Sequence, residues 1–166
     1  NARHQPFLDR EATLDTFFLF VSLARILHVS SHAIFDGKQP GNSFILFYPN
    51  GTDGSSLSLR DVYNMKIPSE MVVLSACETL KGNWKEGEGM FTWGKAFSHS
   101  GALSVFASRW NAHEETSIGM VELFYKNLPD QSKDVALQKA KEKYKNKHPH
   151  FWANFTVIGN QNAIQP

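Results

Sequence analysis

Two stretches of the sequence, Arg25-Ile-Leu-His-Val-Ser-Ser-His-Ala33 and Val72-Val-Leu-Ser-Ala-Cys77, decide the fold and carry its most reactive side chains. Each is a short apolar run that predicts a β-strand and ends on a reactive residue, His32 in the first and Cys77 in the second. Functional groups of α/β proteins collect at the carboxyl ends of adjacent parallel strands. A histidine and a cysteine placed there can form the thiolate–imidazole pair of a cysteine nucleophile.

Helix and strand signals alternate on both sides of these two stretches. Strands are predicted over residues 26–31, 43–48, 71–76, 102–108 and 155–158, and helices over 10–23, 58–64, 90–98, 114–127 and 133–146. This alternation predicts an α/β fold with a mostly parallel sheet and helices on both faces. Because crossovers in such sheets are right-handed, the strand ends that carry His32 and Cys77 are expected at the same edge of the sheet.

The helical periodicity also predicts which side chains are buried. In the first helix we expect Leu14, Phe17, Phe18 and Val21 to face the core, and in the helix over 114–127 Ile118, Val121, Leu123 and Phe124. The lysine-rich run over 133–146 is interpreted as a solvated face.

Length and composition limit the class of protein. The 166 residues suffice for one domain, here taken as residues 1–166. A net charge of +1 does not point to nucleic acid or to an anionic membrane, and no stretch approaches the roughly 20 apolar residues of a membrane span. A single cysteine allows no internal disulfide and favours a reducing compartment, so we expect a cytoplasmic protein.

Cys77 and His32 each have an ordinary alternative interpretation. A lone cysteine after an apolar strand is most often a small buried hydrophobe, and a lone histidine most often has a structural role. Three features favour chemistry at Cys77. It lies where the predicted strand ends, a loop marked by Gly82, Gly87 and Gly89 follows, and a helix comes soon after, whose amino terminus favours a thiolate.

The residues around both sites resemble the CHAT domain, a caspase-like peptidase domain that is often attached to tetratricopeptide repeats. The resemblance rests first on His28-Val-Ser-Ser-His-Ala-Ile-Phe-Asp36, Val72-Val-Leu-Ser-Ala-Cys-Glu-Thr79 and Gly87-Glu-Gly89. It continues in order through Gly101-Ala-Leu-Ser-Val-Phe-Ala-Ser-Arg-Trp110 and His148-Pro-His-Phe-Trp-Ala-Asn-Phe155. As in caspases, the histidine precedes the cysteine, at a separation of about 50 residues in that family.

The resemblance implies a caspase-like fold and a cysteine endopeptidase with a Cys77/His32 dyad that cleaves protein or peptide substrates. It also implies an oxyanion hole formed by the backbone N–H groups of Ala33 and Cys77, and it requires no third acidic member and no cofactor. Asp36 and Glu78 lie near the expected site and are candidates for binding a Lys or Arg of the substrate; as solvated loop residues they would have no such role.

Two departures from the family pattern bear on the site and the fold. Ala33 stands where the family usually has Gly, which would strain the backbone if that position needs a positive φ. Family domains also carry another strand and helix ahead of Arg10, so we expect a sheet that lacks its first strand and a chain that is the carboxyl-terminal part of a larger protein. A repeat-containing region outside the chain would then regulate it.

Other kinds of site are less well supported. His28 and His32 are four residues apart, but they lie in a predicted strand and no third ligand is evident, so no metal site is expected. No Gly-Lys-Ser/Thr element of a phosphate-binding loop occurs. The rival to a peptidase is a non-catalytic CHAT-like scaffold or allosteric binding module.

Overall fold

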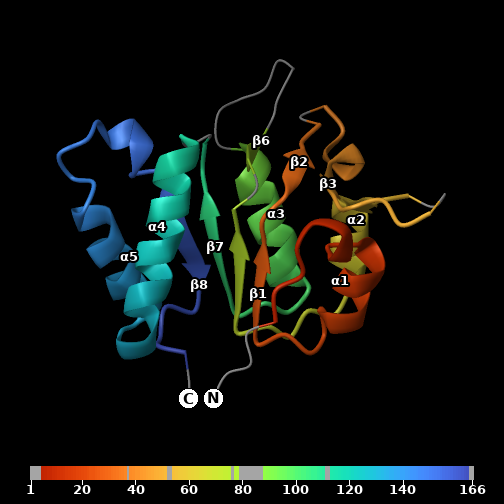
Figure 1. Ribbon diagram of the computed structural model, residues 1–166, viewed down its shortest axis with the longest axis horizontal. Helices are drawn as coiled ribbons and strands as arrows, with labels where there is room; N and C mark the ends of the chain where they lie inside the picture. Colours follow the sequence, from red (N-terminus) through yellow and green to blue (C-terminus); the bar gives the residue numbers. More distant parts are fainter. Residues whose placement is uncertain are drawn as a thin grey trace.

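The structure is a computed structural model that describes residues 5–36, 38–51, 54–75, 77–78, 88–110 and 113–164, with the backbone alone for 77–78 and 88–92. The described residues form two β-sheets, and helices lie on both sides of the larger one (Figure 1). The α-helices are α1 (Leu14–Phe20), α2 (Leu59–Asn64), α3 (Glu88–His99), α4 (Glu114–Asn127) and α5 (Lys133–Glu142). The strands are β1 (Ile26–Val29), β2 (His32–Ile34), β3 (Phe44–Leu46), β4 (Ser56–Ser58), β5 (Met71–Leu74), β6 (Cys77–Glu78), β7 (Ser104–Ser108) and β8 (Phe155–Gly159).

The larger sheet has the strand order β1-β5-β7-β8. β5 pairs in parallel with β1 on one side and with β7 on the other, whereas β8 runs antiparallel to β7 at the edge. Since three of the four strands are parallel and helices connect them, the predicted α/β fold with a mostly parallel sheet is confirmed.

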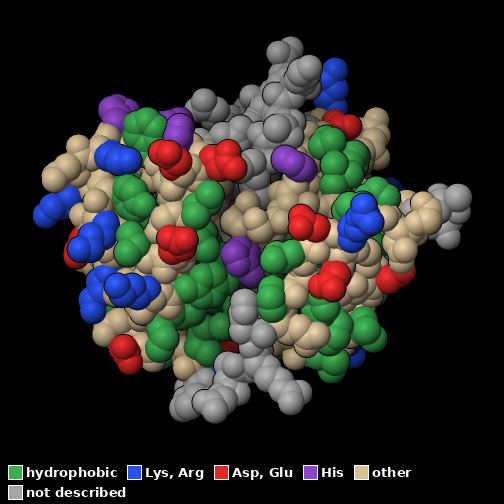
Figure 2. Space-filling view, in the orientation of Figure 1, with side chains coloured by type: hydrophobic (Ala, Val, Ile, Leu, Met, Phe, Trp, Pro, Cys, Tyr) green, Lys and Arg blue, Asp and Glu red, His purple; other side chains and the backbone are tan. Residues whose placement is uncertain are grey.

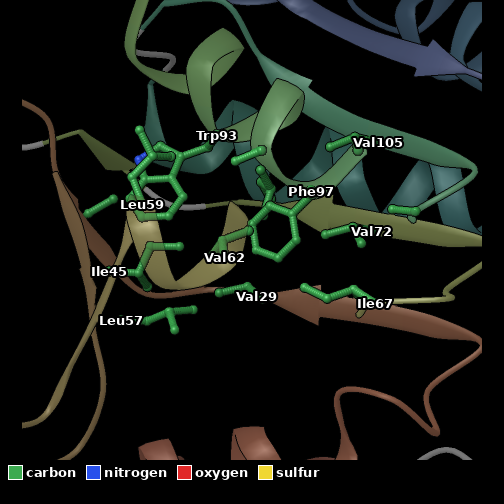
Figure 3. Close-up of a cluster of buried hydrophobic side chains, with 14 of the residues drawn as sticks. Val29, Ile45, Leu57, Leu59, Val62, Ile67, Val72, Trp93, Phe97 and Val105 are labelled. Carbon is green, nitrogen blue, oxygen red and sulfur yellow. The ribbon is translucent and has the colours of Figure 1, made fainter. Parts of the chain in front are cut away.

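The central strand β5 shows why helices are needed on both faces of this sheet. All four of its residues are buried. Val72 and Leu74 pack into a core cluster with Trp93 of α3, part of which is shown in Figure 3. Met71 and Val73 face the other way, into a second cluster with α4 and α5. An apolar strand without alternation is the pattern expected when both faces of a sheet are covered.

The smaller sheet has the order β4-β3-β2-β6 and changes the place of both reactive residues. The expectation that the apolar strands run on to His32 and Cys77 is wrong, because β1 ends at Val29 and β5 ends at Leu74. His32 and Cys77 instead begin β2 and β6 of the second sheet. A serine lies shortly before each of these two residues. The hydrogen bonds of the two serines, described below, lie where the chain passes from the larger sheet to the smaller one.

Two side chains expected in the core, Phe18 and Ile118, are exposed by 47% and 55%. In α1 the buried residue is Phe17, and Phe18 lies one helical step of about 100° further round, on the solvent side. In α4 the buried face includes Thr116 and Met120, and Ile118 lies midway between them on the opposite side. The apolar pattern identified both helices but did not fully identify their inner faces.

The expectation that the whole lysine-rich run is solvated is also wrong at its first residue. Lys133 is buried, because it shares one face of α5 with Ala136, Leu137 and Ala140. Its Nζ donates a hydrogen bond to the backbone oxygen of Asn160 at 3.2 Å.

Two predicted helix boundaries are confirmed in detail. Ser58 caps α2, since its hydroxyl accepts a hydrogen bond from the N–H of Asp61 and the Asp61 carboxylate accepts one from the N–H of Ser58. This reciprocal arrangement satisfies two backbone donors that the helix leaves free. At the end of α3, Gly101 has a φ of 113°, as expected of a glycine that stops a helix.

Candidate active site

His32 and Cys77 lie directly opposite each other on neighbouring strands. β2 pairs in parallel with β6, with His32 opposite Cys77 and Ala33 opposite Glu78. The sequence predicted that the two residues share one edge of the fold, and the strand pairing makes them neighbours. His32 is exposed whereas Ala33 is buried, so the face of β2 to which His32 belongs is open to solvent. The side chains of Cys77 and Glu78, and the loop over residues 79–87, lie outside the described residues.

Two serines hold the segments that lead from the larger sheet to these positions. The hydroxyl of Ser31, the residue before His32, donates a hydrogen bond to the backbone oxygen of Leu46 in β3. Ser75, two residues before Cys77, is bound through its N–H to the oxygen of Val29 at 3.0 Å and through its hydroxyl to Nε2 of His28 at 2.7 Å. Both segments are therefore tied to a neighbouring strand just before the reactive residue.

His28 has a structural environment rather than that of a metal ligand. Besides its hydrogen bond to Ser75, its ring lies next to that of Tyr125, tilted by 41° and with 5.6 Å between the ring centroids. Burial raises the pKa of the Tyr125 hydroxyl above its usual value. In the described part of the chain, no group of three or more His, Cys, Asp or Glu side chains is placed to hold a metal ion.

Ala33, the residue that replaces the glycine of the family pattern, has an unstrained backbone. Among the described non-glycine residues only Asp9 has a positive φ, so the strain considered for Ala33 does not arise. Its methyl group is fully buried in the first core cluster, and its strand has β3 on one side and β6 on the other. Alanine therefore fits this position and contributes to the core beneath the small sheet.

Asp36 uses much of its hydrogen-bonding capacity within its own loop. Its Oδ1 accepts hydrogen bonds from the N–H groups of Lys38 at 2.9 Å and Gln39 at 3.0 Å, and its own N–H donates to the hydroxyl of Ser43. The N–H groups of Gln39 and Lys38 lower the pKa of the Asp36 carboxyl group. The carboxylate thus organises the turn after β2.

The chain that follows β7 is held by hydrogen bonds to the turn before β8. Nε1 of Trp110 donates to the backbone oxygen of His150 at 2.9 Å, and Nδ2 of Asn154 donates to the oxygen of Trp110 at 3.0 Å. The resemblance included these residues without giving them a role. They join the end of β7 to the turn before β8.

The serines were the main residues that the sequence interpretation missed. The available signal was their place, since Ser31 and Ser75 each interrupt an apolar run shortly before the reactive residue. Gly89, expected in the loop after Cys77, lies in α3. None of the described helices has the length and apolar content needed to cross a membrane.

Comparisons with known proteins identify the family and agree with the fold. The family model for the CHAT domain matches residues 1–160. The fold is similar to that in the crystal structure of the Arg specific cysteine proteinase gingipain R, with a TM-score of 0.55 and 13% sequence identity. That likeness covers 94% of this chain and 37% of the gingipain chain, so the chain spans little more than a third of that protein. No curated protein sequence matches the chain.

Proposed function

The chain belongs to the CHAT domain family, and on that basis we propose that it is a caspase-like cysteine endopeptidase with Cys77 as nucleophile and His32 as general base. In the proposed reaction His32 takes the proton of the thiol, and the thiolate attacks the carbonyl carbon of a peptide bond. The imidazolium gives this proton to the leaving amine as the C–N bond breaks, which leaves a thioester on Cys77. Water, deprotonated by His32, then hydrolyses the thioester and restores the thiol.

The observation that supports this proposal is the pairing of β2 with β6, in which His32 lies opposite Cys77. Neighbouring strands are about 4.8 Å apart, and residues opposite each other belong to the same face of a sheet. Because His32 is exposed, a peptide substrate can reach that face.

The backbone N–H groups of Ala33 and Cys77 are the proposed donors of the oxyanion hole. Each donor aimed at the developing negative charge would stabilise the transition state by about 2.7–4 kcal/mol. The unstrained backbone of Ala33 is compatible with this role.

We propose that the substrates are proteins or peptides. A preference for Lys or Arg in the substrate is the specificity to test. Gingipain R, which has a similar fold, is an Arg specific cysteine proteinase. Asp36 and Glu78 stay the candidates for binding a basic side chain. Oδ1 of Asp36 already accepts two backbone hydrogen bonds, and Glu78 pairs with the buried Ala33, on the face of β6 opposite to that of Cys77. We further propose control by a repeat-containing region outside this chain, and a cytoplasmic location, where the Cys77 thiol would stay reduced.

The proposal is tested with the full-length protein, a peptide library and a thiol-directed probe, whose attachment to Cys77, the one cysteine of this chain, is located by peptide mapping. We expect Cys77→Ala to abolish cleavage and His32→Gln to lower kcat about 10²–10⁴-fold. The matched control is His99→Gln, since His99 is an exposed histidine at the end of α3, where the chain turns towards the start of β7. Cleavage that persists in Cys77→Ala would refute the peptidase.

The second candidate is a non-catalytic CHAT-like scaffold. The place of Ala33 favours it, because this residue is fully buried on a strand with neighbours on both sides, where a backbone N–H is commonly used for pairing. A scaffold would leave Cys77 unlabelled at neutral pH and would give no cleavage under any activating condition. A peptidase would show both labelling of Cys77 and cleavage.

A further inference from the structure

A groove of about 480 Å³ lies beside β8, at the edge of the larger sheet far from β1. One wall comes from α5 and the turn after it, the other from Trp152, β8 and Gln161. Its lining residues are Asp134, Leu137, Gln138, Lys141, Glu142, Lys145, Trp152, Phe155, Thr156, Val157 and Gln161. Its volume is within the range of sites that hold small ligands or peptide side chains.

The backbone of β8 faces this side with groups that no described strand uses. Nε2 of Gln161 donates to the backbone oxygens of Val157 at 3.0 Å and Gly159 at 3.1 Å. Both backbone groups of a residue in an antiparallel ladder point to the same side. The N–H of Val157 therefore points away from β7. The side chain of Gln161 donates to two carbonyl groups that would otherwise be free to bond to a further strand.

The charges at one end of the groove favour an acidic occupant. Lys141 and Lys145 line that end, and in Figure 2 Lys and Arg side chains gather over the region of α5, at the left. Burial lowers the pKa of the half-buried Lys141, and the positive charge of Arg109 lowers it further. Within the described ranges, no carboxylate forms an ion pair with Lys141.

The acidic side chains of the lining do not neutralise this end. The carboxylate of Asp134 is engaged by the hydroxyl of Ser132 and by the N–H of Val135 at 2.8 Å, at the opposite end of α5. Glu142 is the remaining acidic side chain of the lining. Its one negative charge is fewer than the positive charges of Lys141, Lys145 and the nearby Arg109.

We propose that this groove binds an extended, acidic segment of a partner protein, which adds to β8 as a further strand and places a carboxylate against Lys141. Backbone hydrogen bonds to β8 would supply affinity in this mode of recognition, and the side chains that face α5 would supply selectivity. Leu137, Trp152 and Phe155 offer apolar contacts for the alternate side chains of such a segment. The proposal does not depend on peptidase activity at Cys77.

The test uses a fluorescent, N-acetylated hexapeptide of alternating Val and Glu as the probe, with a Val and Lys peptide as its charge-reversed counterpart. We expect the acidic peptide to bind about five- to tenfold more tightly at low salt, with the preference lost at high salt. Lys141→Glu should remove or reverse this preference. Lys139→Glu is the matched control, because Lys139 lies on the same helix, exposed and outside the groove.

Strand addition is tested separately by hydrogen exchange at the amide of Val157, which the acidic peptide should protect. A peptide methylated at its backbone nitrogens should give no protection. Equal binding of both peptides, binding without protection of Val157, or a chain that dimerises through β8 and so excludes the peptide would each overturn the proposal; in the last case a second copy is the occupant.

Discussion

Lys133 carries an ammonium group into the interior at the start of α5, with only 1% of the residue exposed. Its hydrogen bond to Asn160 and the one from its own N–H to Gln161, at 2.8 Å, tie the helix to the end of β8. Burial lowers the pKa of Lys133, and the negative charge of Glu70 opposes this shift in part. Because a charged group is costly to bury, this lysine makes local stability depend on pH.

We predict that Lys133→Met changes how stability depends on pH. The pKa of Lys133 in the folded state lies below the unfolded value of 10.5, so the unfolded chain binds more protons between these two values. The wild-type free energy of unfolding should therefore rise relative to that of Lys133→Met as the pH increases towards 10.5. Near pH 7 two effects of Lys133→Met on the free energy of unfolding oppose each other, at about 1–3 kcal/mol each. Removal of the buried charge raises it, and loss of the bond to Asn160 lowers it.

Urea denaturation of both proteins between pH 7 and pH 10 measures this difference. Comparing the two proteins cancels the titration of the other lysines and tyrosines. A difference that stays constant over the whole range would contradict the prediction.

At the scale of elements, the links between the two sheets determine where β2 and β6 begin. Ser75, in the segment that leads to β6, bonds to β1 through both its backbone N–H and its hydroxyl. Ser31 makes the corresponding contact to β3. A strand of two or three residues has few hydrogen bonds of its own, so such links contribute much of its placement.

We predict that Ser75→Ala lowers the reactivity of Cys77 more than it lowers stability. Loss of the hydroxyl contact to His28 should reduce the free energy of unfolding by about 1 kcal/mol. If Cys77 is the nucleophile, its displacement relative to His32 should slow its alkylation about tenfold near pH 7. The measurement is the rate of alkylation by iodoacetamide as a function of pH.

Ser75→Thr keeps the hydroxyl group and should restore both the rate and its pH profile. Equal alkylation rates in Ser75→Ala and in the wild type would show that this contact does not position Cys77.

At the scale of the whole molecule, two core clusters share the strands β5 and β7. Trp93 and Phe97 belong to the cluster beneath α2, α3 and the small sheet, and Phe124 belongs to the cluster beneath α4 and α5. Alternate residues of each shared strand point into opposite clusters, as Val105 and Phe106 do in β7. Removing one cluster would expose one face of the strands that support the other.

We therefore predict that the chain unfolds as one cooperative unit. Phe97→Ala and Phe124→Ala, both at fully buried positions, should each lower the free energy of unfolding by about 3–5 kcal/mol. Tryptophan fluorescence and far-ultraviolet circular dichroism should give coincident urea transitions for both variants. Two separated transitions, or a variant that loses only half of the signal, would indicate two independent units.

Much of the larger sheet and its helices was predictable, because the signals are local and long enough to read. The uninterrupted apolar run at the start of β5 predicted a strand covered on both faces, and the Ser58 cap and both ends of α4 were predicted at the correct residues. The shared edge of His32 and Cys77 followed from the handedness of the crossovers. These features depend on periodicity, on capping chemistry and on chain topology, which a sequence records directly.

The smaller sheet, the opposition of His32 and Cys77 within it, and the burial of Lys133 depended on tertiary contacts. β2 and β6 have three and two residues, too few for any periodic pattern to appear, and they exist because segments far apart in the sequence pair with one another. At its buried position on α5, Lys133 finds a hydrogen-bond acceptor in the backbone oxygen of Asn160, which follows β8. The sequence alone thus named Cys77 and His32 as candidates, whereas the contacts of each residue depend on packing between segments that are far apart in the sequence.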